Sequence, residues 1–324
     1  MLKTSLLTKK ILCFSIISIL IFSACGCKSA KNEKNLSNTV NFTDALNRKV
    51  SIPKKPQRVA ALIGSFADVW VLSGGSLCAA AEDAWDDFGF ESENAVNLGG
   101  AHSPNLENLL SANPQFVIAS ASTASNVEML KALESADIPV AYFDVDCFGD
   151  YLEMLDICTD ITGRKDLYRQ NGLQVKTKIE EIKTNFKNAE IPEENKKILL
   201  LRISSGSVKV KDSNGTVLGE MLKDLGCINI ADSEASLLEN LSAESVIKQN
   251  PYRIFAVTMG DDITKAEKNL KTILSDSAWN TLDAVNSGRI HIMDKKLFNL
   301  KPNSKWAESY EKLSKILLEK SEQN

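Results

Sequence analysis

Two acidic residues occupy the same place in a repeated segment. The stretches "SPNLENLLSANPQFVIAS" (103–120) and "NLSAESVIKQNPYRIFAV" (240–257) align without a gap, and Glu107 falls on Glu244. In each copy the pattern predicts a helix with the acid in its first turn, an Asn-Pro break and a buried strand. A carboxylate in that turn is stabilised by the helix dipole, and an arginine can bind it through two hydrogen bonds. The pair therefore predicts either two matched sites for cationic groups or two acids that simply favour their own helices.

Motifs for other kinds of chemistry are missing from the sequence. It contains no GxSxG, P-loop or HExxH motif, and its two histidines, His102 and His291, are too few for a bare zinc or manganese site. The seven cysteines form no CxxC pair, and those of the mature chain lie in isolated apolar contexts that favour buried free thiols. We therefore expect a protein that is not an enzyme and that holds no metal or cofactor of its own.

Length and charge narrow the class further. The chain has 324 residues, which is enough for two domains with full hydrophobic cores. Its formal net charge is −4 and a quarter of its residues are charged, so no basic field points to nucleic acid as a partner.

The first residues read as an export signal. Three lysines among residues 1–10 precede the uncharged run "ILCFSIISILIF" (11–22), and "SACGC" follows it. A basic region, a short apolar region and small residues before a cleavage site are typical of a signal peptide, and the apolar run is short for a membrane span. The stretch resembles a bacterial lipoprotein box with Cys25 as the lipidated residue. We predict a signal peptide over 1–24 and a flexible polar tether over 25–41. The alternatives are lipidation at Cys27, which follows "ACG", and an ordinary cleaved signal in which Cys25 has no role.

Strand and helix patterns alternate in the first half of the chain. Short apolar runs at 58–63, 115–120 and 138–144 predict buried strands, and a further strand is expected within 76–84. Helical spacing covers 65–75, 105–113 and 126–137. This alternation predicts a parallel, right-handed α/β lobe over 42–149.

The second half repeats this order. Strands are predicted at 196–204, 252–258 and 288–294, and helices at 216–227, 241–250, 268–285 and 304–320. Between the halves, 150–190 reads as almost all helix, with a break near Gly163 and then one helix of roughly 30 Å over 165–187. We therefore predict two α/β lobes, 42–149 and 191–324, joined by a linker with a long helix over 150–190. A cleft between such lobes is where small ligands bind.

The chain resembles the substrate-binding lipoproteins of ABC importers, in the class with a helical backbone that captures ferric siderophores, haem or cobalamin. The resemblance rests on "TDALNRKVSIPKKPQRVAAL", "LGGAHSPNLENLLSANPQFVIAS", "DITGRKD", "LSAESVIKQNPYRIFAV" and "LFNLKPNSKWAESYEKLSKIL", which together span about 40–318. It implies two Rossmann-like lobes with parallel sheets and one long backbone helix, the class III periplasmic binding protein fold. It also implies a monomer, held on the outer face of the cytoplasmic membrane by its lipid anchor.

The family resemblance also gives the two glutamates a role. Each lobe of such proteins presents a glutamate to arginines of a dimeric permease, which works with an ATPase. The matching positions are Glu107 and Glu244. A two-fold permease needs a matched pair of contacts from a monomer, and duplication of the lobe supplies one acid from each half.

Candidate ligand contacts come from loops that the resemblance places around the cleft. Trp85, Phe88, Phe148 and Phe298 are aromatic residues able to stack on a flat or macrocyclic ligand, although burial within a lobe would explain each equally well. Arg202 could bind a carboxylate or phenolate of an iron chelate, or form a salt bridge within its lobe. His102 could ligate haem iron or contact an acid of the ligand, or be an ordinary surface residue, and His291 reads as structural.

These observations predict capture of an iron complex, a ferric siderophore or haem, and its delivery to the permease. Cobalamin is the alternative cargo. If the protein does not serve transport, the alternative function is that of a sensory or adhesive lipoprotein.

Overall fold

The computed structural model describes residues 38–260 and 262–319. The chain divides into two units, Met1–Thr39 and Val40–Asn324, and the second contains both predicted lobes. The predicted signal peptide, Cys25 and most of the predicted tether lie outside the described residues. Within the described ranges, every helix is too short or too polar to cross a bilayer.

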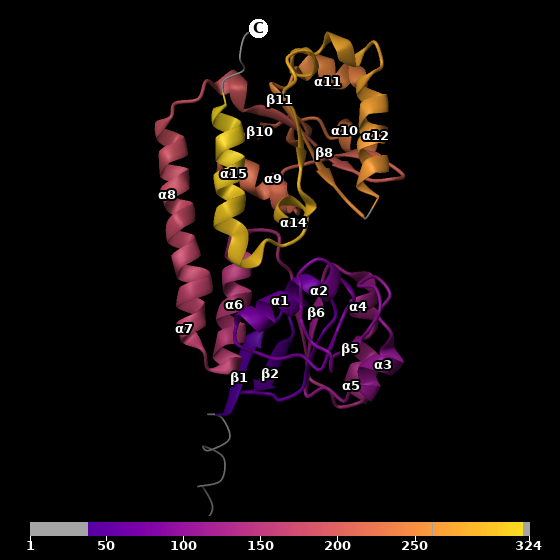
Figure 1. Ribbon diagram of the computed structural model, residues 1–324, viewed down its shortest axis with the longest axis vertical. Helices are drawn as coiled ribbons and strands as arrows, with labels where there is room; N and C mark the ends of the chain where they lie inside the picture. The colour runs from indigo at the N-terminus through magenta and orange to yellow at the C-terminus, as the bar shows by residue number, and fades with distance from the viewer. Residues whose placement is uncertain (1–37, 261, 320–324) are drawn as a thin grey trace, which may run out of the picture. The chain divides into compact units, whose positions relative to one another are not determined.

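The first lobe is built on a five-stranded parallel sheet, as the alternating pattern predicts. The strand order is β5-β4-β3-β6-β7. The strands are β3 (Val59–Ala61), β4 (Ala79–Ala80), β5 (Val96–Asn97), β6 (Phe116–Ser120) and β7 (Val140–Phe143). The helices are α1 (Gly64–Leu72), α2 (Asp83–Asp86), α3 (Leu106–Ser111), α4 (Ala124–Glu128) and α5 (Leu130–Ser135). Figure 1 shows them together in the lower lobe.

The second lobe repeats this topology. Its parallel strands run in the order β10-β8-β11-β12, which matches β4-β3-β6-β7, and β9 adds an antiparallel strand to β8 that the sequence pattern did not predict. The strands are β8 (Lys197–Ile203), β9 (Val208–Lys211), β10 (Ile228–Asn229), β11 (Arg253–Thr258) and β12 (Ile290–Met293). The helices are α9 (Val217–Asp224), α10 (Ser236–Glu239), α11 (Ala243–Gln249), α12 (Ile263–Leu274), α13 (Asp283–Asn286) and α14 (Lys295–Phe298).

The duplication extends to the ends of the repeated helices. Asn105 begins α3 and Ser242 begins α11, and each side chain accepts the backbone N–H three residues on, at 2.9 and 3.3 Å. After each helix, Asn113 and Asn250 adopt the left-handed conformation, with φ of 45° and 44°. Asparagine tolerates this conformation, and the following proline prevents continuation of the helix. The same local chemistry thus produces the same helix–turn–strand unit in both lobes.

A helical linker joins the lobes, as the sequence predicts. Helix α6 (Phe148–Thr162) ends at Gly163 with φ of 76°, and α7 (Lys165–Tyr168) continues through a π-helical turn, η3 (Arg169–Leu173), into α8 (Gln174–Asn188). Gly172 allows the π-helical turn to pack closely on α6. A Cβ at this position would lie only 3.0 Å from a methyl group of Leu152 on α6.

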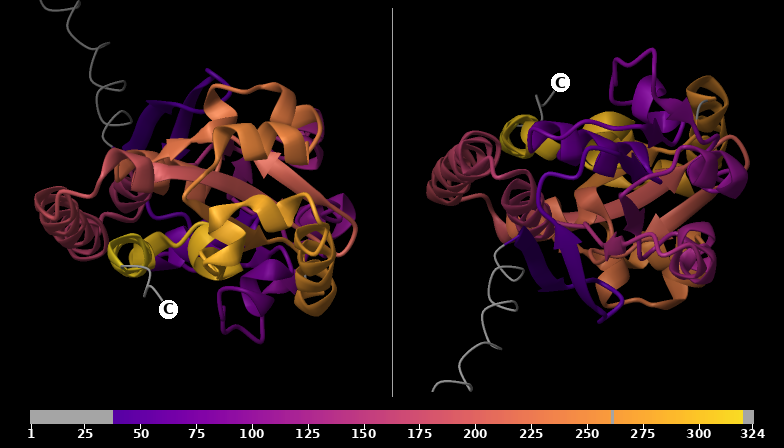
Figure 2. Two further views of the ribbon diagram at one scale, coloured as in Figure 1. Left: turned by 90° about the horizontal axis from the view of Figure 1, so that it is seen from above. Right: turned by 90° about the horizontal axis from the view of Figure 1, so that it is seen from below.

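The last helix, α15 (Trp306–Leu318), packs against α8. Figure 1 shows the two helices side by side along the upper lobe, with α7 continuing the same rod beside the lower lobe, and in both views of Figure 2 α8 lies at the outer edge with α15 next to it. The chain therefore passes between the lobes in the linker, as predicted, and the C-terminal helix α15 packs on α8 beside that passage.

One buried cluster runs through both lobes and these helices. It includes Phe116 of the first sheet, Ile179 of α8, Phe255 of the second sheet and Trp306 of α15. A shared core of this kind resists large changes in the angle between the lobes, because interiors are close-packed.

Two predicted helices are shorter than expected. The segment 126–137 forms α4 and α5, and 268–285 contains the end of α12, the 3-10 turn η6 (Trp279–Thr281) and α13. The break after α12 falls in a polar stretch, where the Ser275 hydroxyl donates to the carbonyl of Thr272 and the Asp276 carboxylate accepts the backbone N–H of Ala278. Such local hydrogen bonds compete with helix continuation.

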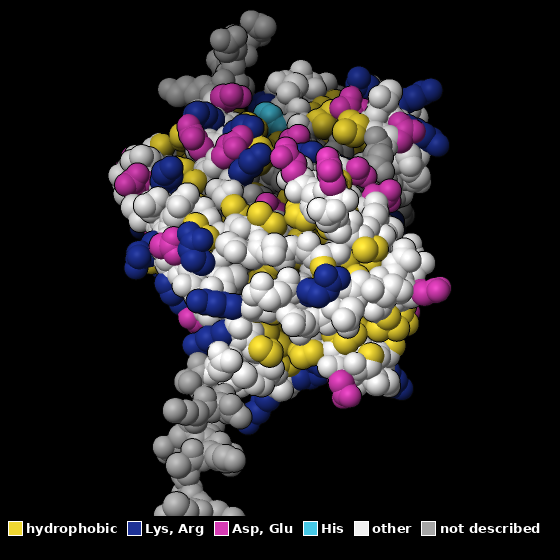
Figure 3. Space-filling model, turned by 60° about the horizontal axis from the view of Figure 1, so that its bottom comes forward, with side chains coloured by type: hydrophobic (Ala, Val, Ile, Leu, Met, Phe, Trp, Pro, Cys, Tyr) yellow, Lys and Arg dark blue, Asp and Glu magenta, His cyan; other side chains and the backbone are white. Residues whose placement is uncertain are grey.

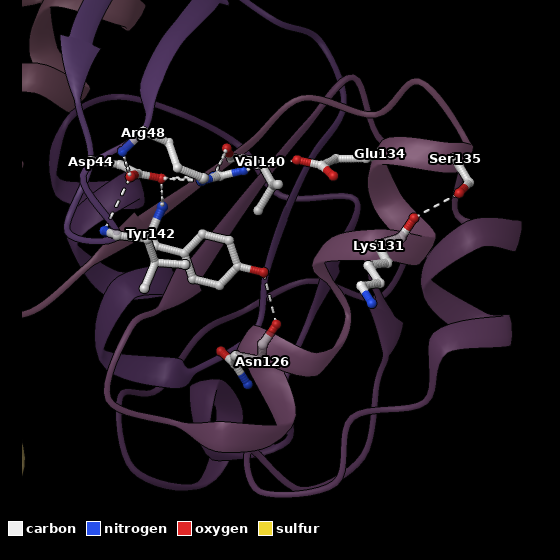
Figure 4. Close-up of polar contacts among 9 residues, drawn as sticks. Asp44, Arg48, Asn126, Lys131, Glu134, Ser135, Val140 and Tyr142 are labelled. Atoms are coloured by element: carbon white, nitrogen blue, oxygen red, sulfur yellow. Dashed lines mark hydrogen bonds and ion pairs between the residues drawn. The ribbon is translucent and has the colours of Figure 1, made fainter.

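The hairpin of β1 (Thr39–Thr43) and β2 (Lys49–Pro53) is tied to the first sheet by a buried acid. Asp44 accepts hydrogen bonds from the Nε and Nη2 of Arg48, at 3.0 and 2.7 Å, and from the backbone N–H of Tyr142 on β7. Arg48 Nη2 also donates to the Val140 carbonyl, and its guanidinium lies 5.0 Å from the centre of the Tyr142 ring (Figure 4). The segment "DALNR" thus fixes where the chain enters the first lobe.

The cysteines within the described ranges are all free thiols. Cys158 and Cys227 are buried, and Cys78 and Cys147 are half-buried. The prediction of buried free thiols therefore fits Cys158 and Cys227, whereas Cys78 and Cys147 are partly exposed.

Candidate ligand cleft

Loops from the carboxyl ends of the two sheets meet each other across the lobes. Lys295 forms an ion pair with Asp87 at 3.0 Å, and Lys301 forms one with Asp146 at 3.1 Å. Asp87 and Asp146 follow strands of the first sheet, whereas both lysines follow β12. In open α/β sheets ligands bind at the carboxyl ends of strands, so the region between these loops is the candidate cleft.

The two sides of this cleft differ in charge. The segment 82–93 contains six acidic residues and no basic ones, and the loop after β7 adds Asp144 and Asp146. On the facing side, Lys295, Lys296 and Lys301 follow β12, and Arg202 lies near the end of β8. Figure 3 shows acidic and basic side chains gathered around a hollow in the upper part of that view. The lobes therefore attract each other electrostatically across the candidate cleft.

The Lys295–Asp87 pair is shielded from solvent. Each side chain is only 15% exposed, and the neighbouring Lys296 donates from its Nζ to the carbonyl of Asp86 at 3.3 Å. Helix α14 is thereby held against α2 of the other lobe. Removing one partner of such a pair leaves a charge that water cannot fully solvate.

Arg202 is a half-buried cation with capacity to bind another group. Its Nε is buried and has no hydrogen-bond partner among the described residues. Burial lowers the pKa of the guanidinium, and the negative charge of Asp146 opposes this shift. No acid of its own lobe forms an ion pair with Arg202 among the described residues, and Asp146, whose charge acts on it, belongs to the other lobe.

The four predicted stacking residues differ in their accessibility. Phe298 is only 3% exposed, so it is part of the core and is left out of the candidate site. Phe148 is half-buried against the rings of Trp306 and Tyr151, with centroids 6.0 and 5.9 Å away. It begins α6, and its ring contributes mainly to the packing between α6 and α15.

Trp85 and Phe88 retain partly exposed rings. Trp85 packs edge-on against Phe90, with centroids 5.2 Å apart, and both Trp85 and Phe88 are half-buried. They lie within or just after α2, next to the acids that meet the other lobe. Trp85 also packs against the buried core cluster, so part of its ring serves the packing of the lobe.

The two histidines lie in different environments. His102 is exposed, and its charge acts on Asp83, whose carboxyl has a pKa raised by burial. His291 stacks on Phe255 at 5.2 Å, and burial, followed by the charge of Arg253, lowers its pKa to about 4. His291 is therefore structural, as predicted. Within the described residues no group of three His, Cys, Asp or Glu side chains could hold a metal ion.

Asp83 and Asp146 are site residues that sequence reasoning missed. Asp83 accepts the backbone N–H of Gly64 at 2.9 Å through one oxygen, and its other oxygen is buried without a partner in the described part of the chain. Asp146 is one of two acids in the loop that follows β7, a composition that is common in turns. The acid-rich composition of 82–93 was the available signal, but the pairing across the lobes has no sequence signature.

Glu107 and Glu244 occupy equivalent positions on the repeated helices. Both are in the first turn, of α3 and α11 respectively, both are exposed, and neither forms an ion pair with another described residue. Figure 1 shows α3 in the lower lobe and α11 in the upper lobe. Leu110, also on α3, leaves 38% of its surface exposed, so this helix offers apolar contact area beside the acid.

Comparison with known proteins gives the following matches. The family model described as periplasmic binding protein matches residues 59–297. The ABC transporter substrate-binding lipoprotein YvrC of Bacillus subtilis is 22% identical over 260 residues, which are 80% of this chain and 79% of that protein. The iron-uptake system-binding protein of the same organism is 21% identical over 288 residues, covering 86% and 88%. The crystal structure of Staphylococcus aureus SirA complexed with staphyloferrin B is similar with a TM-score of 0.64 and 21% identity, covering 86% and 97%.

Proposed function

This chain belongs to the periplasmic binding protein family and has its class III fold, and from this premise we propose that it captures an iron complex and delivers it to an ABC importer. The observation that carries the proposal is the pair of duplicated lobes whose ligand-binding edges face each other. Ion pairs cross that junction, and a half-buried arginine with an unpaired Nε lies beside it.

The cargo we propose is a ferric siderophore or haem. Support comes from Trp85 and Phe88, whose partly exposed rings can stack on a planar or macrocyclic complex. Arg202 can donate to a carboxylate or phenolate of such a complex. The similarity to the iron-uptake system-binding protein points in the same direction. Cobalamin is the alternative cargo, because stacking rings serve a corrin equally well.

We propose that Glu107 and Glu244 dock the loaded protein on the permease. Their exposure and their equivalent first-turn positions support this role, since an exposed carboxylate is free to accept both N–H groups of an arginine. The shared core supports delivery by a protein whose lobes keep nearly the same angle, so that the two acids keep a fixed spacing.

We also propose an export signal over 1–24 and lipidation at Cys25, which would hold the protein on the outer face of the cytoplasmic membrane. The composition of 1–24 and the lipoprotein named among the relatives support this location. In this role the protein binds cargo without chemical change, as transport binding proteins do.

Titration of tryptophan fluorescence tests the proposed cargo, because Trp85 is one of the proposed ligand contacts. The complexes to compare are a ferric hydroxamate, a ferric catecholate, haemin and cyanocobalamin. We expect saturable quenching by at least one iron complex, and a Trp85→Phe variant should lose much of the signal. Binding of cyanocobalamin alone would assign the alternative cargo, and binding of none would refute capture of these complexes.

A further inference from the structure

One carboxylate of the first lobe faces the cationic side of the cleft. Asp146 pairs with Lys301 at 3.1 Å, and its charge acts on Arg202. Its Oδ2 lies 3.9 Å from the point where a Cβ on Gly215 would stand, so it also reaches the loop after β9. The ion pair and this close approach place Asp146 against two segments of the second lobe, and its charge also acts on Arg202 in a third.

The position of Asp146 is fixed by the start of α6. The carboxylate of Asp150 accepts the backbone N–H groups of Asp146 and Cys147, both at 3.0 Å. Asp146 is therefore held at the junction by the backbone, and its side chain remains 34% exposed. A ligand entering beside Arg202 would meet this negative charge in a fixed place.

We infer that Asp146 is a specificity-determining residue that sets the charge of cargo the cleft accepts, an inference that rests on the proposed function. The Asp146 carboxylate offsets the positive charge of Lys301 and Arg202, which a highly anionic ferric chelate would need for binding. Such a chelate must therefore displace the carboxylate or bind despite the repulsion between like charges. A neutral chelate of similar size is not repelled by Asp146 in this way. The wild-type cleft thus favours cargo of low net charge.

The alternative is that Asp146 only fastens the two lobes together. In that case its removal would change the affinity for every cargo by a similar factor, because all ligands share the same protein conformation. The ratio of affinities for two chelates of different charge separates the two roles. It is also insensitive to a partial loss of folded protein.

The experiment compares ferrichrome, a neutral trihydroxamate complex, with the trianionic ferric tris-catecholate complex ferric enterobactin. Both are titrated by tryptophan fluorescence into wild type, Asp146→Asn and Asp144→Asn. Asparagine keeps the shape of the side chain and removes its charge. Asp144 is the matched control, since it is exposed in the same loop and forms no ion pair with another described residue.

We expect Asp146→Asn to raise the affinity for the trianionic complex relative to the neutral one by about tenfold or more, because a like charge is removed at close range. The preference should grow at low salt, where screening is weakest. Asp144→Asn should leave the ratio within about threefold of wild type, as expected for an exposed, screened charge.

An unchanged ratio in Asp146→Asn, or an equal change in Asp144→Asn, would overturn this inference and leave the proposed function standing. Tighter binding of ferric enterobactin than of ferrichrome by wild type would also overturn it. If neither wild type nor the variants bind either complex, Asp146 cannot discriminate between the two complexes and the inference is wrong. If haemin and cyanocobalamin also fail to bind, the proposed function falls with it.

Discussion

At the scale of single residues, glycine marks the places where the backbone approaches itself most closely. A Cβ on Gly64 would lie 2.5 Å from the backbone N of Ala84 and 2.7 Å from the carbonyl oxygen of Asp83, and backbone atoms cannot move aside easily. This contact packs α1 against α2, and α2 carries the acids of the cleft. The sequence predicts a turn near Gly64, but the close approach itself depends on a segment about twenty residues away.

We predict that Gly64→Ala lowers the free energy of unfolding by about 2 kcal/mol, as overpacked substitutions commonly do. Chemical denaturation measures this change. Gly206→Ala is the control, because nothing lies within 4 Å of an added Cβ there, and its effect should stay within about 0.5 kcal/mol. Equal effects of the two substitutions would contradict the described packing of α1 on α2.

His291 gives a second residue-scale prediction, concerning pH. Its pKa is lowered from 6.5 to about 4, so the folded protein keeps it neutral where the unfolded chain binds a proton. The free energy of unfolding should therefore fall as pH drops from about 6.5 to 4. His291→Phe should flatten this dependence in denaturation curves, whereas His102→Gln, at an exposed position, should preserve it. A slope that His291→Phe leaves intact would disprove the assignment.

At the scale of elements, local signals account for most of what the sequence predicts correctly. Asn105 and Ser242 begin the repeated helices, Asn-Pro pairs end them, and Gly163 separates α6 from the long linker helix. Hairpin strand β9 and the π turn at 169–173 were not predicted. Strand β9 depends on pairing with β8, and the turn depends on contact between Gly172 and α6, so neither is encoded by a local pattern.

The β1–β2 hairpin supplies an element-scale prediction. Asp44 has a fully buried side chain that joins Arg48 to the edge of the first sheet, so Asp44→Ala leaves a guanidinium and backbone donors without their acceptor. We expect the free energy of unfolding to fall by about 3 kcal/mol. The exposed Asp166, paired with Arg164, is the control, and Asp166→Ala should cost less than about 1 kcal/mol. Comparable losses from both substitutions would contradict the role of Asp44.

At the scale of the whole molecule, the sequence predicts the two lobes and the helical linker but not how the lobes meet. The Lys301–Asp146 pair joins residues 155 positions apart, and Asn303 reaches Ser65 and Asp68 across an even longer separation. Contacts between residues so far apart in the sequence cannot be predicted from local periodicity or from a motif. These contacts bring the acidic loops of one lobe to the basic segment of the other. They also explain why Phe298, which was predicted to contact the ligand, is buried in the core.

Docking gives a prediction at this same scale. Glu107→Arg combined with Glu244→Arg should abolish delivery to the permease, because in the proposed docking each new cation would meet an arginine of the partner. Cargo affinity measured by fluorescence should remain within about threefold of wild type, since exposed charges away from the cleft are screened by salt. Glu239→Arg, on the neighbouring helix α10, is a matched exposed control. If cells with the double substitution still take up the cargo, Glu107 and Glu244 do not dock the protein on the permease.

The most direct test of capture and delivery is uptake of radioactive iron, supplied as the complex that binds best, by cells lacking this gene. We predict that uptake is lost on deletion and is restored by the wild-type protein. Undiminished uptake after deletion, when this complex is the sole iron source and no second importer carries it, would contradict the account.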